Sequence, residues 1–258
     1  MSEVIALCYH GVSPTWPSSL AVTPERLERQ VMWFLRRGYS PVTVRDAVRA
    51  RDHRRRLAIT FDDALASVFT RALPVLERLG AVATVYAPSR FLADGGPMAW
   101  PEVAGHLATE HAEELAAMSV EQLRDVARRG WEVGSHTRTH PWLPTLDDAA
   151  LADELVGSKA DLEALLELPI RTLAYPFGAY DERVARATLA AGYEAAVTLP
   201  DRVPAWPRSP DGLERMALPR IGIYEKDDER RFRLKVSRPV RALRRSPLWS
   251  AVGALRRT

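Results

Sequence analysis

The feature that most constrains the fold of this chain is a recurring unit in which a helical pattern ends at a glycine and a strand-like run follows. The glycines are Gly38, Gly80, Gly130 and Gly192. A glycine just past the end of a helix can adopt a positive φ angle and so ends the helix cleanly. This repeated alternation of helix and strand predicts a parallel α/β arrangement.

Several of the short apolar strands that the sequence predicts end in a polar or reactive residue. His10 follows VIALCY, the pair Asp62 and Asp63 follows LAITF, and His136 follows WEVGS. In parallel barrels the functional site lies at the carboxyl ends of the strands. The sequence therefore predicts a barrel whose site gathers these side chains. Residues 90–119 are irregular and are expected to form an excursion over its mouth, and residues 200–212 are expected to be a loop.

The composition limits the kind of protein this can be. The chain has 258 residues, 47% of them hydrophobic, so it can bury a sizeable core. Its single cysteine, Cys8, excludes an internal disulfide and a cysteine-rich zinc site and is expected to be a core residue. The sequence contains no long apolar segment, and its first residues lack the basic start of a signal peptide. We therefore expect a cytoplasmic protein, although a chain from which a leader had been removed would look the same.

The charge is unevenly distributed and indicates two regions. Residues 1–228 carry 26 basic and 32 acidic groups, whereas residues 229–258 carry 10 basic groups and one acid. We expect residues 1–228 to form one domain and residues 229–258 to be a basic C-terminal tail, interrupted by Pro239 and Pro247. Arginines interleaved with apolar residues can lie on an anionic membrane surface or meet an acidic partner. The alternatives are an arm packed on the barrel and a disordered tail. Nucleic-acid binding is not expected, because the body is mildly acidic.

The stretch GSHTRTHPW places two histidines four residues apart, His136 and His140. On a helix, positions i and i+4 lie on one face, so two imidazoles at this spacing can converge on a metal ion. The alternative is a pair of surface histidines near a turn. The choice depends on whether the chain supplies a third ligand.

The stretch LAITFDDA supplies candidate carboxylates, Asp62 and Asp63, at the end of an apolar strand. Burying paired charges is costly, so packing alone does not explain them; the alternative is an acid pair that caps a helix. One aspartate can complete an Asp–His–His metal site while the other acts as a separate general base. Ligands of this kind suit Zn²⁺, and also Co²⁺, Ni²⁺ or Fe²⁺.

Five stretches in order resemble the motifs of the polysaccharide deacetylases, carbohydrate esterase family four, also called the NodB homology domain. They are CYHGV at 8–12, TFDDA at 60–64, SHTRTH at 135–140, AYPFGAYD at 174–181 and LPRIGI at 218–223. Three of these stretches, CYHGV, AYPFGAYD and LPRIGI, are similar to motifs of a subgroup that includes poly-N-acetylglucosamine deacetylases. The resemblance covers about residues 4–223.

This resemblance implies a distorted (β/α)7-type barrel and hydrolysis of an N-acetyl group from an amino sugar. Carried over to this chain, it implies that Asp63, His136 and His140 bind one divalent metal ion, often zinc, and that Asp62 is the general base. Substrates that fit are a glycan, a glycolipid or a glycosylated intermediate.

Two positions depart from the commoner form of the family. The third motif usually has an arginine that orients the base, and here that position is Ala174. The usual late histidine, the general acid, is missing, because no histidine follows His140. The subgroup resemblance offers Arg220 as the partner of Asp62 and His10 as the acid. The alternatives are a surface arginine and a strand-end histidine bonded to the backbone.

Three aromatic residues are further candidates for contact with the substrate: Trp142, Tyr175 and Phe177. They could stack on a sugar face, and a backbone N–H near Phe177 could stabilise the oxyanion; packing in the core or a loop is the alternative. Two other functions remain open. The same scaffold could hydrolyse another, cyclic amide, or it could be a non-catalytic member that binds a glycan or acts as a scaffold.

Overall fold

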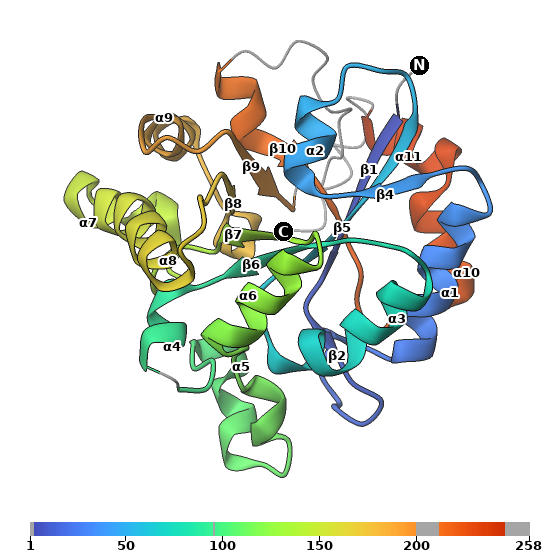
Figure 1. Ribbon diagram of the computed structural model, residues 1–258, viewed down its shortest axis with the longest axis horizontal. Coiled ribbons are helices and arrows are strands. Elements are labelled where there is room, and N and C mark those ends of the chain that lie inside the picture. The colour runs from blue at the N-terminus through green and yellow to red at the C-terminus, as the bar shows by residue number, and fades with distance from the viewer. Residues whose placement is uncertain (1–2, 95, 200–211, 246–258) are drawn as a thin grey trace, which may run out of the picture.

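The main sheet is entirely parallel and curls into a nearly closed barrel, as the recurring unit predicts (Figure 1). The computed structural model describes residues 3–94, 96–199 and 212–245. The strand order is β10-β9-β8-β7-β6-β5-β1-β11, with β4 paired beside β5. The strands are β1 (Glu3–Tyr9), β4 (Ser40–Val42), β5 (Arg55–Phe61), β6 (Thr84–Ala87), β7 (Glu132–Ser135), β8 (Thr172–Ala174), β9 (Ala195–Thr198), β10 (Leu218–Pro219) and β11 (Ile221–Gly222). The expected barrel is confirmed, whereas almost all of the predicted loop at 200–212 lies outside the described residues.

The barrel closes through one short segment that carries Arg220. On one side of this residue, β10 pairs with β9 through Leu218 and Val197; on the other, β11 pairs with β1 through Ile221 and Leu7. The two ends of the sheet are therefore joined across a single residue. A minor sheet of β2 (Gly11–Val12) and β3 (Ala21–Val22) lies apart from the barrel sheet.

Helices surround the strands in Figure 1. They are α1 (Pro24–Leu35), α2 (Val44–Arg49), α3 (Leu73–Arg78), α4 (Ser89–Asp94), α5 (Pro101–Ala104), α6 (Val120–Arg128), α7 (Asp148–Ala152), α8 (Ser158–Leu166), α9 (Glu182–Ala190), α10 (Glu229–Val236) and α11 (Arg238–Arg245). Two π-helical segments, η1 (Val68–Ala72) and η5 (Asp153–Gly157), and five short 3₁₀ segments complete the described helices: η2 (Gly105–Ala108), η3 (Ala112–Leu115), η4 (Leu143–Thr145), η6 (Pro176–Gly178) and η7 (Gly212–Ala217).

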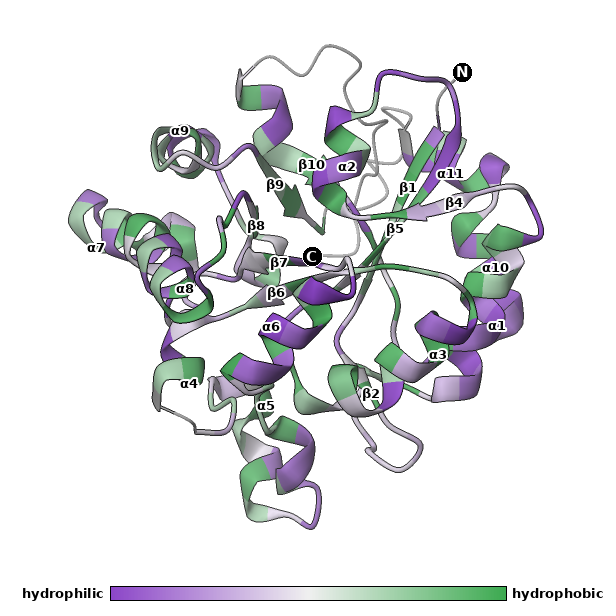
Figure 2. Cartoon of the chain, viewed as in Figure 1, coloured by the Kyte–Doolittle hydropathy of each residue, from purple (hydrophilic) through white to green (hydrophobic). Residues whose placement is uncertain are grey.

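The four glycines of the recurring unit all have positive φ, between 62° and 86°, and each follows a helix. At Gly38 an added Cβ would meet nothing within 4 Å, so the backbone angle rather than crowding requires glycine there. The central strands are apolar, as Figure 2 shows, and β1 and β5 are almost completely buried. The helix–strand pattern thus builds a barrel core that holds the strand ends rigidly.

The basic segment begins as two helices, α10 and α11, that pack on the barrel. The Phe232 side chain is 1% exposed, and its ring lies 6.1 Å from the rings of both Trp33 and Phe34. Arg241 of α11 is also buried and pairs with Glu3 of β1, with 2.5 Å between Nη2 and Oε1. A packed arm therefore describes residues 229–245, and residues 246–258 lie outside the described part. None of the described helices is both long enough and apolar enough to span a bilayer.

Replacing Phe232 with alanine tests this docking. Truncating a buried phenylalanine costs about 3 kcal/mol or more of unfolding free energy, because the transfer term and the cavity term add. Leu234, on the same helix, is 61% exposed, so Leu234→Ala should change stability by less than about 0.5 kcal/mol. Urea denaturation of both variants measures the difference, and equally small effects would show that α10 is not docked in solution.

Candidate active site

The carboxyl ends of neighbouring parallel strands bring the predicted polar residues to one rim of the barrel. His10 follows β1, Asp62 and Asp63 follow β5, and His136 follows β7. The backbone N–H of Asp62 donates to the carbonyl of Tyr9 (2.9 Å), so the pairing of β1 and β5 continues to this point. Both aspartates are nearly fully buried, at 2% and 3% exposure.

Asp62 forms a bidentate ion pair with Arg220. The two guanidinium nitrogens donate to the two carboxylate oxygens, with Nη1–Oδ1 at 2.6 Å and Nη2–Oδ2 at 2.7 Å. Arg220 is 1% exposed and also donates to Thr60 Oγ1 (2.9 Å). Burial alone would raise the pKa of Asp62, but the charge of Arg220 outweighs it and holds that pKa well below its usual range. Asp62 is therefore an oriented, ionised carboxylate.

Asp63 faces a different set of partners, the two histidines. Its Oδ1 lies 3.4 Å from Nε2 of His136 and 3.7 Å from Nε2 of His140, and it has no hydrogen-bond partner within the described structure. Positive φ angles at Asp63 (70°) and Ala64 (49°) turn the chain sharply after the strand. The two adjacent carboxylates thus have different partners: Asp62 pairs with Arg220, and Asp63 faces the two histidines.

The imidazole of His136 is oriented by a backbone carbonyl. Its Nδ1 lies 2.8 Å from the carbonyl oxygen of Ala174, which can only accept, so Nδ1 carries the proton. In the neutral ring the lone pair is then on Nε2, the nitrogen that lies 3.4 Å from Asp63 Oδ1. This is the usual way in which a protein orients a histidine that binds a metal.

His140 reaches the site from a loop, so the expectation of a helix carrying both histidines is wrong. Residues 136–142 contain no helix, and both Thr137 (φ 65°) and His140 (φ 62°) have left-handed backbone angles. The tight loop, rather than a helical face, brings the two imidazoles together, with ring centroids 4.8 Å apart.

The residues present fit a divalent cation. Asp63, His136 and His140 each offer one ligand atom, and these atoms lie within 4.8 Å of one another. In a tetrahedral zinc site with metal–ligand bonds of about 2.0–2.1 Å, the ligand atoms lie about 3.3–3.5 Å from one another. The distances from Asp63 Oδ1 to the Nε2 atoms of His136 (3.4 Å) and His140 (3.7 Å) are close to this range. A buried carboxylate oxygen without a hydrogen-bond partner is costly unless a cation compensates it.

The histidines and Asp63 influence one another's protonation. For His140, burial and then the nearby His136 lower the pKa to about 3, which keeps the ring neutral. For His136, burial opposes the charged form, but the charges of Asp62 and Asp63 outweigh it and raise the pKa. For Asp63, burial is likewise outweighed by the histidines, and its pKa is lowered.

His10 and Cys8 form a second cluster with Asp62. Ligand-type atoms of Cys8, His10 and Asp62 lie within 4.8 Å of one another. His10 is half-buried, and its Nδ1 has no hydrogen-bond partner among the described residues. The Cys8 thiol is buried, as expected for a core residue, and donates to Asp62 Oδ2 (3.3 Å). Burial raises the pKa of this thiol well above its usual value.

The three aromatic candidates are placed differently from one another. Phe177 and Trp142 are 37% and 50% exposed with ring centroids 5.4 Å apart, and Phe177 meets His140 edge-on at 4.7 Å. Tyr175, in contrast, is fully buried. Its hydroxyl donates to the carbonyl of Met216 (2.8 Å) and its N–H to that of Val197 (3.1 Å). The prediction that Tyr175 contacts substrate is therefore corrected, because neither its ring nor its amide is available.

Three contacts of the site were not foreseen from the sequence. Trp100 stacks on His140, with ring centroids 4.1 Å apart, and belongs to the excursion at 90–119, which thus packs against the site. The carbonyl of Ala174, which contacts His136, could not be predicted because a backbone contact does not depend on the identity of the side chain. The contact of Cys8 could have been found, because Cys8 and His10 are two residues apart and side chains at this spacing on a strand point to the same face.

Comparisons with known proteins identify the family of this chain and proteins of similar fold. A family model described as polysaccharide deacetylase matches residues 49–196, more than half of the chain. The chain is 27% identical over 197 residues to YxkH of Bacillus subtilis (strain 168), which is named after the same family. That match covers 74% of this chain and 63%, less than two thirds, of YxkH.

The chain is also 22% identical over 231 residues to poly-beta-1,6-N-acetyl-D-glucosamine N-deacetylase of Staphylococcus aureus (strain COL), covering 81% of this chain and 74% of that protein. In fold it is similar to the Streptococcus pyogenes deacetylase PplD, solved with acetate: the TM-score is 0.74 at 20% identity, covering 91% of this chain and 98% of that one.

The range matched by the family model contains Asp62, Asp63, His136 and His140, whereas His10 and Arg220 lie outside it. The resemblance noted in the sequence motifs is confirmed by this match and by the shared fold. The chain belongs to the polysaccharide deacetylase family.

Proposed function

We propose that this protein is a metal-dependent hydrolase that removes the N-acetyl group from an N-acetylated amino sugar and releases acetate. The observation that carries the proposal is that two adjacent carboxylates, Asp62 and Asp63, have different partners. Arg220 holds Asp62 ionised. Asp63 faces His136 and His140 with an oxygen that has no hydrogen-bond partner among the described residues. A base and a cation site side by side are what metal-assisted hydrolysis of an amide needs.

Asp63, His136 and His140 would hold the cation. Two imidazoles and one carboxylate with a further position open are typical of catalytic zinc sites, so we propose Zn²⁺, with Co²⁺, Ni²⁺ and Fe²⁺ as alternatives. A divalent cation bound there supplies Lewis acidity, which polarises the acetyl carbonyl and lowers the pKa of water.

Asp62 is the proposed general base. Arg220 donates to both carboxylate oxygens and the Cys8 thiol donates to Oδ2, so these contacts fix the orientation of the carboxylate. Asp62 accepts a proton from water as the water oxygen adds to the acetyl carbon. Since the arginine keeps the carboxylate ionised, it is ready to accept throughout the neutral pH range.

His10 is the proposed general acid. It lies beside Asp62 and is half-buried at the rim, so it can reach both the reacting centre and solvent. It donates a proton to the sugar nitrogen as the C–N bond breaks, because an unprotonated amide nitrogen is a poor leaving group. The products are acetate and a free amino sugar.

Trp142 and Phe177 are the proposed sugar contacts. Both are exposed beside His140, and an apolar ring face can pack on the C–H face of a pyranose. The Staphylococcus aureus relative is named for its action on a polymer of N-acetylglucosamine. This supports an N-acetylglucosamine-containing glycan or glycolipid as the substrate class.

We also propose that the α10–α11 surface contacts an anionic membrane or an acidic partner. Leu234 and Leu243 are exposed, at 61% and 48%, on helices rich in arginine. For the membrane contact, the expected result is sedimentation with anionic vesicles and not with neutral ones, and no binding to either would contradict that contact. The expected cytoplasmic location stays a prediction.

Acetate release tests the proposed chemistry. Zinc-loaded protein should release acetate from N-acetylglucosamine oligomers or from lipid- or nucleotide-linked N-acetylglucosamine. Asp62→Asn and His10→Ala should each lower kcat/KM by about 10²- to 10⁴-fold, the usual contribution of a general base or acid. His53 is exposed on a turn remote from the motifs, so His53→Ala is the matched control and should leave the rate unchanged. Absence of release from every substrate, or full activity in Asp62→Asn, would overturn the proposal.

Replacing Arg220 with methionine tests the ion pair through stability and pH. At pH 7 the variant should lose about 3–5 kcal/mol of unfolding free energy, because Asp62 is left as an uncompensated buried charge. In the wild type the folded pKa of Asp62 lies below its unfolded value of about 3.9, so the stabilisation by the pair is complete above that pH and is lost as the pH falls through the folded pKa. In the variant, burial raises the pKa of Asp62, so the difference from wild type should shrink as the pH falls from 7 to 5.

Urea denaturation at the two pH values measures this difference. Arg230→Met, which removes an exposed arginine, should change little at either pH. Adding Asp62→Asn to Arg220→Met should recover part of the loss. A loss that is the same at pH 5 and pH 7 would contradict the assigned cause.

A further inference from the structure

The loop that carries both histidines is strained. Within five residues, Thr137 and His140 adopt positive φ angles, 65° and 62°, although neither is glycine. Each such residue costs about 1–3 kcal/mol and persists only where its surroundings hold it. The position of His140 therefore depends on what fixes the backbone between the two histidines.

Glu154 fixes this backbone from outside the motif. Its Oε2 accepts the N–H groups of Arg138 (2.7 Å) and Thr139 (3.0 Å), and its Oε1 accepts the hydroxyl of Thr139 (2.6 Å). Successive N–H groups of this kind form a concavity that binds anions, and here the chain fills it with its own carboxylate. Glu154 is 7% exposed, so these bonds are shielded from water.

The contacts continue from Glu154 to the metal ligand. The Thr137 hydroxyl oxygen accepts the N–H of His140 (3.2 Å), and the Thr137 N–H donates to Ser135 Oγ (3.1 Å). Each N–H from Thr137 to His140 thus has an acceptor. Two of these four donors depend on Glu154 alone.

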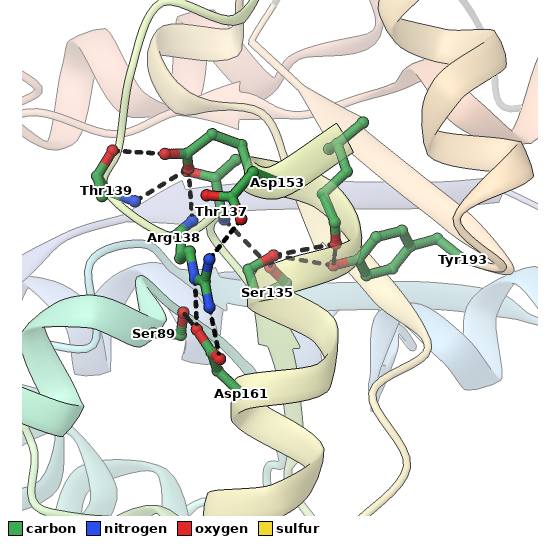
Figure 3. A network of polar contacts seen from close by, with 11 residues as sticks. Ser89, Ser135, Thr137, Arg138, Thr139, Asp153, Asp161 and Tyr193 are labelled. Atoms are coloured by element: carbon green, nitrogen blue, oxygen red, sulfur yellow. Dashed lines mark hydrogen bonds and ion pairs between the residues drawn. The ribbon is translucent and has the colours of Figure 1, made fainter. Parts of the chain in front are cut away.

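The side chain of Arg138 anchors the same loop in a second direction, as Figure 3 shows. Its guanidinium binds both oxygens of Asp161 (2.7 and 3.0 Å) and one oxygen of Asp153 (2.5 Å), while Ser89 donates to Asp161 (3.0 Å). A Cβ added at Gly157 would lie 3.0 Å from this guanidinium, so glycine allows the arginine to pack on the helix.

Glu154 lies in an unusual turn of its helix. The π-helical segment η5 (Asp153–Gly157) separates α7 from α8, and both Glu154 and Leu155 within it are buried. A π turn inserts an extra residue and re-aims the side chains beside it, which is why such turns are frequent at functional sites. Here Leu155 faces the hydrophobic core while Glu154 faces the histidine loop.

We propose that Glu154 is a positioning residue for the metal site: by binding the amides of Arg138 and Thr139, it holds His140 at its distance from His136 and Asp63. The inference rests on the metal site of the proposed function. Residues that orient metal ligands typically contribute about 10- to 100-fold to metal affinity.

Metal binding to the whole 258-residue chain, rather than activity, tests this role. Apoprotein is titrated with Co²⁺, read by its visible absorption, and with Zn²⁺ in competition with a chromophoric chelator. Glu154→Ala should bind zinc about 10- to 100-fold more weakly and show an altered cobalt spectrum. Glu154→Gln should stay near wild type, because its amide oxygen can accept both N–H groups and its NH₂ can donate to the Thr139 hydroxyl. Glu163→Ala, the control, removes a carboxylate that accepts the backbone N–H of Ile170 and forms no hydrogen bond or ion pair with the described residues of the histidine loop, and it should not change zinc affinity.

Wild-type zinc affinity and cobalt spectrum in Glu154→Ala would overturn the positioning role. If circular dichroism shows that Glu154→Ala does not fold, Thr139→Val decides instead. It removes one hydrogen bond to Glu154 and should weaken zinc binding by about fivefold; unchanged affinity overturns the role.

The outcomes separate this inference from the proposed function. Zinc binding that depends on His136 and Glu154 without acetate release from any substrate would overturn the deacetylase proposal and leave the positioning role standing. Acetate release together with zinc affinity insensitive to Glu154 would do the reverse. A wild-type protein that binds no zinc or cobalt would overturn the metal site on which both depend.

Discussion

The buried pair of Arg220 and Asp62 is the interaction on which the rest of the structure depends. Arg220 lies on the segment that joins the two ends of the sheet, and Asp62 lies at the end of β5. Two charges buried in this way are stable only together, since either one alone would carry the full cost of desolvation. The charge of the proposed base, Asp62, therefore depends on the segment that closes the barrel, because that segment carries Arg220. With Asp62 committed to Arg220, only Asp63 remains to face the histidines.

The fold and most of the site could be predicted from the sequence because they depend on short-range patterns. Helices that end in glycine and apolar strands predict a parallel sheet, and parallel strands bring their carboxyl ends together, so His10, the two aspartates and His136 could be expected at one rim. The resemblance to known motifs then indicated Arg220 as the partner of Asp62, and in the structure the two side chains form an ion pair.

What could not be predicted depends on backbone conformation or on contacts distant in sequence. Spacing by itself favoured a helix for His136 and His140, but two left-handed residues achieve the same convergence in a loop. The carbonyl of Ala174 orients His136 whatever side chain stands there. Tyr175 follows the strand end directly, yet its buried hydroxyl bonds to a carbonyl elsewhere in the chain. Neither contact leaves a trace in local composition.

Strain is concentrated in the site. Among the described residues, all non-glycine positions with positive φ except Glu167 belong to the loops that carry the site: Asp63, Ala64, Thr137, His140 and Phe177. Such conformations need support from the surrounding structure. The excursion supplies some of it, since Met118 donates to the carbonyl of Ala64 (2.7 Å) and Trp100 stacks on His140. Residues that look peripheral in the chain thus hold the strained turns in place.

The closing segment has a consequence for how the protein comes into being. Leu218 to Gly222 follows every other described strand of the barrel in the sequence, and it pairs with β9 on one side and with β1, the first described strand, on the other. During synthesis, a chain that has emerged only as far as β9 already contains both aspartates and both histidines, but it lacks the arginine that keeps Asp62 charged. Without that arginine, burial of Asp62 would favour the protonated acid, which cannot accept a proton from water. The proposed role of Asp62 as a base therefore depends on the closing segment, so activity at this site would report that the barrel has closed.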